Sequence, residues 1–372
     1  MTDDQNVPAS RYGIPRGVEV AAAWSLRLLI IAAGVAGLMW LLARLSEVSV
    51  PIAIALLGTA LLIGIVDRLA SWGVPRIVGA LGAVVLVVAA LVGAFSLIGQ
   101  QLSTQFDDLR LALVKGIAQV QTWARTGPLQ VSDSQLESWI DKLQDMIASG
   151  GSEWLGQATQ VGSQISHFVA GIFIVLFAMF FFLYEGERIW TWVVSFFPSA
   201  AREQIGISGR VAWMSLTGFV RATVLVALAD ALGIMLVAVL LDVPLAGAIG
   251  VLVFIGAFIP IVGALMSGLV AVLVALVAHG FWTAVFMLIG VIVVQQIESH
   301  VLQPFLTGRL VAIHPLAIIL AIAIGIAAYG IVGALLAVPA AAVFNSIVRQ
   351  LRSAAADREA SGGDTEAEPA PG

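Results

Sequence analysis

A stretch of 130 residues, from 219 to 348, carries only five charged side chains, and this restricts the fold more than any other feature of the sequence. The five are Arg221, Asp230, Asp242, Glu298 and Arg309. About one residue in four is charged in a typical soluble domain, whereas this chain is 11% charged and 60% hydrophobic. Because so many apolar side chains cannot be hidden in one soluble core, the sequence predicts an all-α polytopic membrane protein.

Six apolar runs have about the 20 residues that a transmembrane helix needs. They cover 26–45, 50–66, 77–99, 166–184, 219–241 and 281–298. We expect the first three to form a scaffold at 26–99, after a cytoplasmic segment at 1–25. The fourth is expected to lie with a cytoplasmic loop in 166–210. The segment 1–25 is long and acidic for the start of a signal peptide, so we expect the first span to be retained.

Two other stretches differ in composition from the spans. Residues 100–165 contain seven acidic and four basic side chains, and apolar residues such as Phe106, Leu109 and Leu113 recur at helical spacing. This pattern predicts a small amphipathic helical domain outside the membrane. Residues 349–372 are small, polar and rich in Pro and Gly, which predicts a disordered cytoplasmic tail.

The basic residues are placed asymmetrically around the predicted spans. With both termini in the cytoplasm, thirteen of the eighteen lysines and arginines fall on the cytoplasmic side, which is the usual bias. The domain at 100–165 is then extracytoplasmic. A net charge of −5 with only two lysines argues against a nucleic-acid partner, because phosphate binding needs clustered basic residues.

Two further apolar segments, 244–278 and 315–348, are too long for one span and are interrupted near the middle by Gly and Pro. Each begins with Pro-Leu-Ala and later contains Ile-Val-Gly-Ala-Leu, and the two copies are 71 and 70 residues apart. We interpret them as an internal repeat of two helical hairpins, inverted with respect to each other within a core at 211–348. The alternative is a pair of kinked full-length spans.

The tips of these hairpins would lie at Pro260 and Gly263 in the first segment. In the second segment they would lie at Tyr329, Gly330 and Gly333. Gly adopts positive φ readily and Pro lacks an amide donor. Backbone groups freed in this way would line a cavity at membrane depth.

Asp230 lies deep within the predicted span 219–241. An ionised carboxylate near the bilayer centre costs roughly 2.5–3.5 kcal/mol on insertion scales, so this group either faces water or a partner, or binds a proton. Both behaviours suit ion coupling, and the alternative is a neutral Asp hydrogen-bonded to a neighbouring helix. Arg221 is on the opposite face of the helix and about 13.5 Å away along its axis, so the two should not pair.

The run 281–298 ends in a group of polar side chains. Gln295 and Glu298 share one helical face, and Gln296 and His300 share a neighbouring one. Glu298 is a candidate gate or coupling carboxylate, with an interfacial residue as the alternative. His314 precedes the second broken segment, where it is either part of a substrate pathway or a loop residue.

Sequence motifs for enzymatic chemistry are missing. The chain has no GxxxxGK[ST], HExxH or GxSxG motif and no cysteine, and its four histidines are scattered. We therefore expect that the protein is not an enzyme and uses no cofactor or metal.

Several residues of the C-terminal half together form a recognisable pattern: Arg221, 259–263, 296–298, Pro304, Gly308, 314–316, 330–335 and Pro339. This pattern resembles the signature of the autoinducer-2 exporter family of bacterial permeases. The resemblance implies a homo-oligomeric transporter of the bacterial inner membrane. Some members export a small signalling molecule, and others exchange sodium or lithium for protons. Ser299 and His300 stand where members often have Asn, so the pattern indicates architecture more than cargo.

Taken together, these observations predict a secondary transporter, a permease or exporter of a small hydrophilic signalling molecule or metabolite. Its partners would be that molecule or an ion, the lipid bilayer and further copies of itself, and Asp230 or Glu298 would provide any ion coupling. The core would move against the scaffold to give alternating access. The alternatives are a sodium or lithium/proton antiporter, a passive channel, and a membrane scaffold or envelope regulator acting through 100–165.

Overall fold

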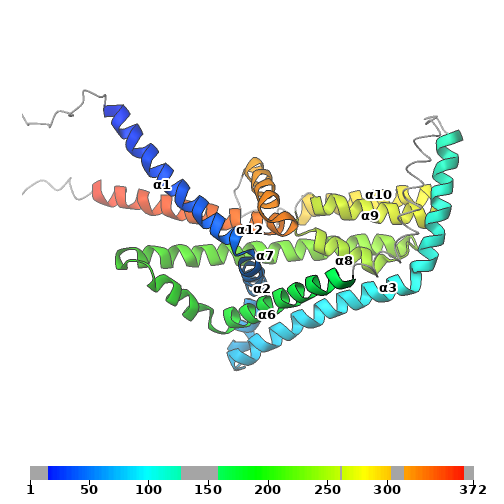
Figure 1. The fold of residues 1–372 in the computed structure, drawn as a ribbon, viewed down its shortest axis with the longest axis horizontal. Coiled ribbons are helices and arrows are strands. Elements are labelled where there is room, and N and C mark those ends of the chain that lie inside the picture. Colours follow the sequence, from blue (N-terminus) through cyan, green and yellow to red (C-terminus); the bar gives the residue numbers. More distant parts are fainter. Residues whose placement is uncertain (1–15, 127–157, 260–261, 303–313, 364–372) are drawn as a thin grey trace, which may run out of the picture. The chain divides into compact units, whose positions relative to one another are not determined.

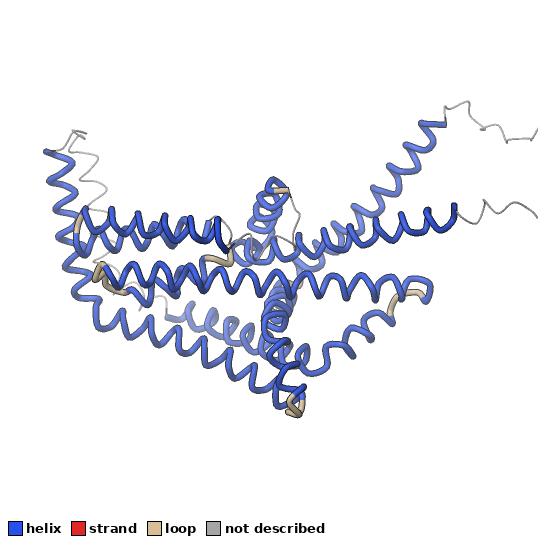
Figure 2. The backbone as a smooth tube through the Cα atoms, turned by 180° about the vertical axis from the view of Figure 1, so that it is seen from behind, coloured by secondary structure: helices blue, strands red, loops and turns tan. Residues whose placement is uncertain are grey.

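The computed structural model describes residues 16–126, 158–259, 262–302 and 314–363, and within these ranges the regular structure is helical (Figure 2). The helices are α1 (Arg16–Arg44), α2 (Ser46–Ser71), α3 (Arg76–Thr126), α6 (Ala158–Ser195), α7 (Ser199–Leu240), α8 (Ala246–Gly256), α9 (Val262–His279), α10 (Phe281–Ile297), the π-helical turn η1 (Glu298–Leu302) and α12 (Pro315–Gly363) (Figure 1). The chain forms two units, Met1–Val50 and Pro51–Gly372. Helix α1 belongs to the first unit and is described by itself.

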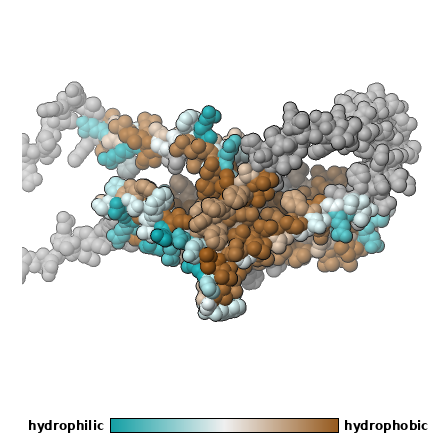
Figure 3. Space-filling view, turned by 60° about the horizontal axis from the view of Figure 1, so that its bottom comes forward, coloured by the Kyte–Doolittle hydropathy of each residue, from teal (hydrophilic) through white to brown (hydrophobic). Residues whose placement is uncertain are grey.

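Seven helices of the described ranges are long and apolar enough to cross a membrane. Six of them contain the predicted spans apart from a few terminal residues, and the seventh is α12. Large apolar side chains such as Phe173, Leu236 and Ile292 are exposed along them, and Figure 3 shows a broad apolar area on one face. Soluble proteins rarely expose an apolar area of this extent to water. The prediction of an all-α polytopic membrane protein is confirmed.

Several predicted boundaries fall inside continuous helices. Helix α3 runs for 51 residues from Arg76 to Thr126, so the third span and the start of the region 100–165 form one helix. No proline interrupts this helix, which explains its continuity. Helix α6 likewise begins at Ala158, before the predicted fourth span, and α7 begins at Ser199 within the predicted loop. Residues 127–157 of the predicted domain lie outside the described residues.

The C-terminal end also differs from the prediction. Helix α12 continues to Gly363, whereas the composition of 349–372 predicted a disordered tail. The sequence from 353 to 360 contains four alanines together with Arg358 and Glu359, and these residues favour helix. The remainder, 364–372, lies outside the described residues.

Buried apolar side chains form two separate main clusters in the second unit. The first cluster joins α2, α3 and α6 through residues that include Val66, Ala80 and Leu183. The second joins α7, α8, α9 and α10 through residues that include Ile234, Val253 and Met287. The two clusters share no helix, and α3 of the first also packs against α8 and α9 of the second.

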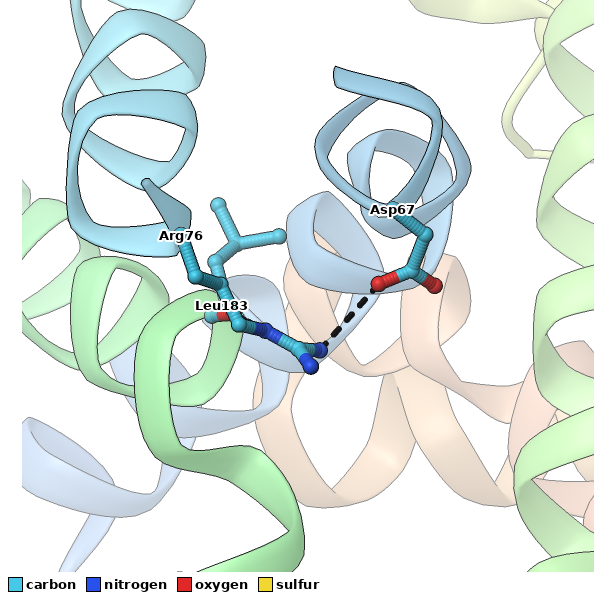
Figure 4. A network of polar contacts seen from close by, with 3 residues as sticks. All are labelled: Asp67, Arg76 and Leu183. Atoms are coloured by element: carbon cyan, nitrogen blue, oxygen red, sulfur yellow. Dashed lines mark hydrogen bonds and ion pairs between the residues drawn. The ribbon is translucent and has the colours of Figure 1, made fainter. Parts of the chain in front are cut away.

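Polar contacts tie together one end of the α2, α3 and α6 helices (Figure 4). The Nη2 atom of Arg76 lies 3.2 Å from Oδ1 of Asp67, and the Nε–H of the same arginine donates to the carbonyl oxygen of Leu183 at 3.2 Å. Arg188 and Glu185 form another ion pair on α6. These charges mark this end of the helices as the place where the membrane meets water, because charged side chains avoid the apolar core.

The first broken segment folds back on itself. Helix α8 has 11 residues and is therefore only about 16 Å long, too short to cross a bilayer of about 30 Å. Helix α9 returns and packs against α8. A Cβ atom on Gly263 would collide with the carbonyl oxygen of Gly256, so the two backbones touch near the tip. The predicted hairpin at 244–278 is confirmed, although Pro260 lies outside the described residues.

The second broken segment also reverses direction, at Tyr329 and Gly330 within α12. Both residues leave the helical conformation, and Gly330 has φ 60° and ψ −140°, which a residue with a Cβ avoids. In a straight helix Gly325 and Gly333 would be about 12 Å apart. Their backbones instead approach so closely that a Cβ on either would collide with the other's carbonyl oxygen. The hairpin at 315–348 is therefore confirmed, and a continuous kinked span is excluded.

A side chain from α3 caps the start of the first hairpin. The backbone N–H of Ala248 donates to Oε1 of Gln101 at 2.8 Å. The first amides of a helix have no partner within it, so this bond joins α8 to α3 in the conformation that the structure shows. We expect Gln101→Ala to lower the stability by about 1 kcal/mol, measured by thermal unfolding in detergent. An unchanged midpoint would show that the cap contributes nothing, and Gln100→Ala, one residue away, is the matched control.

Candidate functional site: a carboxyl pair between α7 and α10

Asp230 is buried inside the membrane-spanning part of α7. Its exposed fraction is 4%, and its Oδ1 atom has no hydrogen-bond partner among the described residues. A buried carboxyl oxygen without a partner is costly, since burial removes the water that would otherwise solvate it. A group of this kind in a membrane protein marks a functional site more often than a structural one.

Two glycines set the register between α7 and the antiparallel α10. A Cβ on Gly233 would meet the Val294 side chain at 3.0 Å, and a Cβ on Gly290 would collide with Val237. Position 233 thus lies opposite 294, and position 237 lies opposite 290. Residue numbers therefore decrease along α10 as they increase along α7. One turn further, this register places Asp230 opposite 297 and 298.

Glu298 occupies that place, and its side chain lies within hydrogen-bonding reach of the Asp230 carboxyl. It begins the π-helical turn η1, and such turns change the direction of side chains relative to an α-helix and are common at functional sites. Neither ionised carboxylate has a proton to donate. Contact between the two groups therefore requires a proton to be held between them, or a cation.

The other polar residues at this end of α10 bond mostly to their own helix. Oγ of Ser299 donates to the carbonyl oxygen of Gln295 at 2.6 Å, and Nδ1 of His300 lies 3.1 Å from that of Gln296. The side chain of Gln296 is exposed, and that of Gln295 is partly buried. Of the residues predicted here, the structure brings only Glu298 against Asp230.

The remaining predicted site residues lie elsewhere. Arg221 is exposed and does not approach Asp230; its guanidinium lies against Gly64 of α2. His314 is exposed, and its Nδ1 accepts the N–H of Leu316 at 3.2 Å, so it caps the start of α12. Gly263 and Gly333 are buried where their hairpin arms touch. Of the predicted site residues, Asp230 and Glu298 thus form a carboxyl pair, and Gly263 and Gly333 lie near the two hairpin tips. Arg221, Gln295, Gln296 and His314 belong to neither feature.

Sequence reasoning missed the partners of these groups. Asp230 and Glu298 are 68 positions apart in the sequence, and only the packing of α7 on α10 brings them together. Glycines within the apolar runs at 233 and 290 were the available signal, because Gly weakens a helix and is retained where helices approach closely. The same signal applies to Gly256 and Gly325, the partners of the hairpin glycines.

Comparison with known proteins agrees with this architecture. The family model described as "AI-2E family transporter" matches residues 28–353, which include every helix that contributes to the two apolar clusters and to the carboxyl pair. The chain belongs to the AI-2E transporter family. It is therefore a multi-pass membrane protein of a transport family.

Two relatives show how far the similarity extends. The chain is 37% identical over 334 residues to the "Putative transport protein MT0215" of Mycobacterium tuberculosis, covering 90% of this chain and 91% of the relative. It is 23% identical over 260 residues to the "AI-2 transport protein TqsA" of Escherichia coli, covering 69% and 72%. The resemblance to this family, which the sequence pattern between Arg221 and Pro339 indicated, thus extends over most of the chain.

Proposed function

We propose that this protein is a secondary transporter of a small hydrophilic signalling molecule or metabolite, coupled to proton movement at the Asp230–Glu298 pair. The observation that carries the proposal is a buried Asp230 carboxyl with an unpartnered oxygen and a second acid against it. Two acids sharing one proton change their charge when that proton leaves. A change of charge in a place without water favours a change of conformation, which is the requirement of coupled transport.

The two apolar clusters support alternating access. Helices α7 to α10, which include the first hairpin (α8 and α9), would move as a core against the scaffold of α2, α3 and α6. The Asp230–Glu298 pair belongs to the core, so loss or gain of a proton there would shift the balance between its two positions. The second hairpin packs on α7 through Phe219 and would move with this core.

The proposed setting is a bacterial inner membrane with both termini in the cytoplasm, and the positive-inside bias of the sequence supports this orientation. Assembly with further copies of the chain is part of the proposal. The resemblance to the family and the large apolar area outside the two clusters support it.

A specific observation also favours a second candidate, exchange of sodium or lithium for protons. The paired carboxyl groups offer oxygen ligands, which small hard cations prefer. Displacement of the shared proton by such a cation would couple the two movements directly.

One experiment separates these proposals. Everted vesicles containing the full chain are given a panel of small hydrophilic solutes, sodium and lithium, with and without a pH gradient. We expect one solute class to move faster than in empty vesicles and to respond to the gradient. Movement of sodium or lithium alone would select the antiporter, and gradient-independent flux far above transporter turnover would identify a channel. No flux of any kind above empty vesicles would contradict the transport proposal.

A further inference from the structure

A groove of about 520 Å³ lies between α2 and α7, away from the Asp230–Glu298 pair. Its apolar walls come from Leu61, Ile65, Leu69, Val224 and Leu225, together with Trp72. Ile65, Trp72 and Leu225 are 49%, 75% and 54% exposed, so the groove is open to its surroundings. A volume of this size accommodates part of an amphiphilic molecule.

Two arginines, Arg68 and Arg221, also line the groove. No carboxylate is among the lining residues, and neither arginine forms an ion pair with a carboxylate of the described ranges. The neighbouring Asp67 is engaged with Arg76. The guanidinium of Arg221 packs against α2 at Gly64, where a Cβ atom would collide with it. Two unneutralised guanidinium groups in a groove with apolar walls form a site for an anion.

The position of the groove identifies the kind of anion. Arg68 lies in the last turn of α2, at the same end as the ion pairs of Arg76 and Arg188 that mark the edge of the membrane. Trp72 is one turn further, and tryptophan side chains favour this interface. The apolar walls formed by Ile65 and Leu225 are in reach of acyl chains. A molecule with an anionic head group to lie beside the arginines and a hydrocarbon chain to lie along the walls is an anionic phospholipid.

We propose that this groove binds an anionic phospholipid, with the phosphate between Arg68 and Arg221 and an acyl chain along the apolar walls. Basic pockets between membrane helices bind anionic head groups in this way. The site lies between the helices of the two apolar clusters, and its existence does not depend on what the protein transports.

The test is native mass spectrometry of the purified full-length protein with equal amounts of palmitoyl-oleoyl phosphatidylglycerol and phosphatidylcholine. We expect preferential retention of phosphatidylglycerol. Each of Arg68→Gln and Arg221→Gln should weaken it about fivefold, and the double variant should remove the preference. Arg210→Gln, an exposed arginine of α7 outside the groove, should leave it unchanged. Equal retention by the wild type and the double variant would overturn the proposal.

Further variants separate the possible occupants. The double variant Arg68→Lys, Arg221→Lys keeps both positive charges and should keep most of the preference for phosphatidylglycerol. If the Gln variants lose this preference but show normal size-exclusion elution and helix content, the loss is due to the missing charge. Leu225→Asn should weaken lipid retention without affecting a bare phosphate. Displacement of the lipid by millimolar glycerol phosphate would instead show a soluble anion site. A change in subunit number in the Gln variants, with lipid retention unchanged, would assign the groove to another copy of the chain. Either of these two results contradicts the proposal.

Discussion

Replacement of Gly263 or Gly333 by Ala is expected to lower the stability of the protein strongly, although it adds only one methyl group. At both positions the new Cβ would collide with a backbone carbonyl oxygen, of Gly256 in the first hairpin and of Gly325 in the second. Backbone cannot rotate aside as a side chain can, so the arms of the hairpin must separate. Such overpacking costs roughly 1–3 kcal/mol, and here it also opens the tip.

The matched control is Gly82→Ala in α3, where a Cβ meets no atom of the described residues within 4 Å. Gly→Ala in an unobstructed helix is neutral or stabilising by up to about 1 kcal/mol. Thermal unfolding of the three variants in detergent should therefore show two lowered midpoints and one that is equal or raised. Equal midpoints for Gly263→Ala and Gly82→Ala would mean that the first hairpin is not packed as described.

The second large effect is expected from Asp230→Asn and Glu298→Gln. Either change leaves the size of the side chain nearly the same but removes one acid from the shared proton, so the pair can no longer alternate between two charges. We expect flux to lose its dependence on the pH gradient, with at least about a tenfold fall in gradient-driven uptake. The double variant should behave as either single one, because groups that act as a unit are not additive.

In these variants the stability of the fold should not fall together with transport. Asn at 230 lacks the negative charge that Glu298 opposes, so folding should be maintained or improved while coupling is lost. Asp242→Asn is the control, because Asp242 is exposed in the loop between α7 and α8 and has a positive φ that Asn also tolerates. Gradient-driven uptake that persists in Asp230→Asn, with normal dependence on pH, would remove the pair from the mechanism.

Much of the fold could be predicted from apolar run length and the position of Gly and Pro. The six spans followed because about 20 apolar residues match the bilayer, and both hairpins followed because Gly and Pro interrupt segments too long for one crossing. Helix continuity could not be read in this way. The ends of α3 and α6 extend past the membrane runs because polar residues continue a helix as readily as apolar ones.

The sequence allowed the two acids of the candidate site to be identified but not their contact with each other. Asp230 could be singled out because a carboxyl group in an apolar span is expensive. Its contact with Glu298 depends on the register of α7 on α10, which the close approaches at Gly233 and Gly290 determine. Arg68 could not be assigned to the groove from the sequence, because a charge at the end of a span usually faces only water and lipid head groups.

The most direct test of coupling at the Asp230–Glu298 pair is the movement of protons during transport. Liposomes that contain the full chain and an internal pH-sensitive dye are supplied with the solute selected by the vesicle panel. Wild type should show a pH change that begins with solute addition, whereas Asp230→Asn and Glu298→Gln should show none, and Asp242→Asn should match the wild type. A pH change of the same size in Asp230→Asn and the wild type would contradict the account.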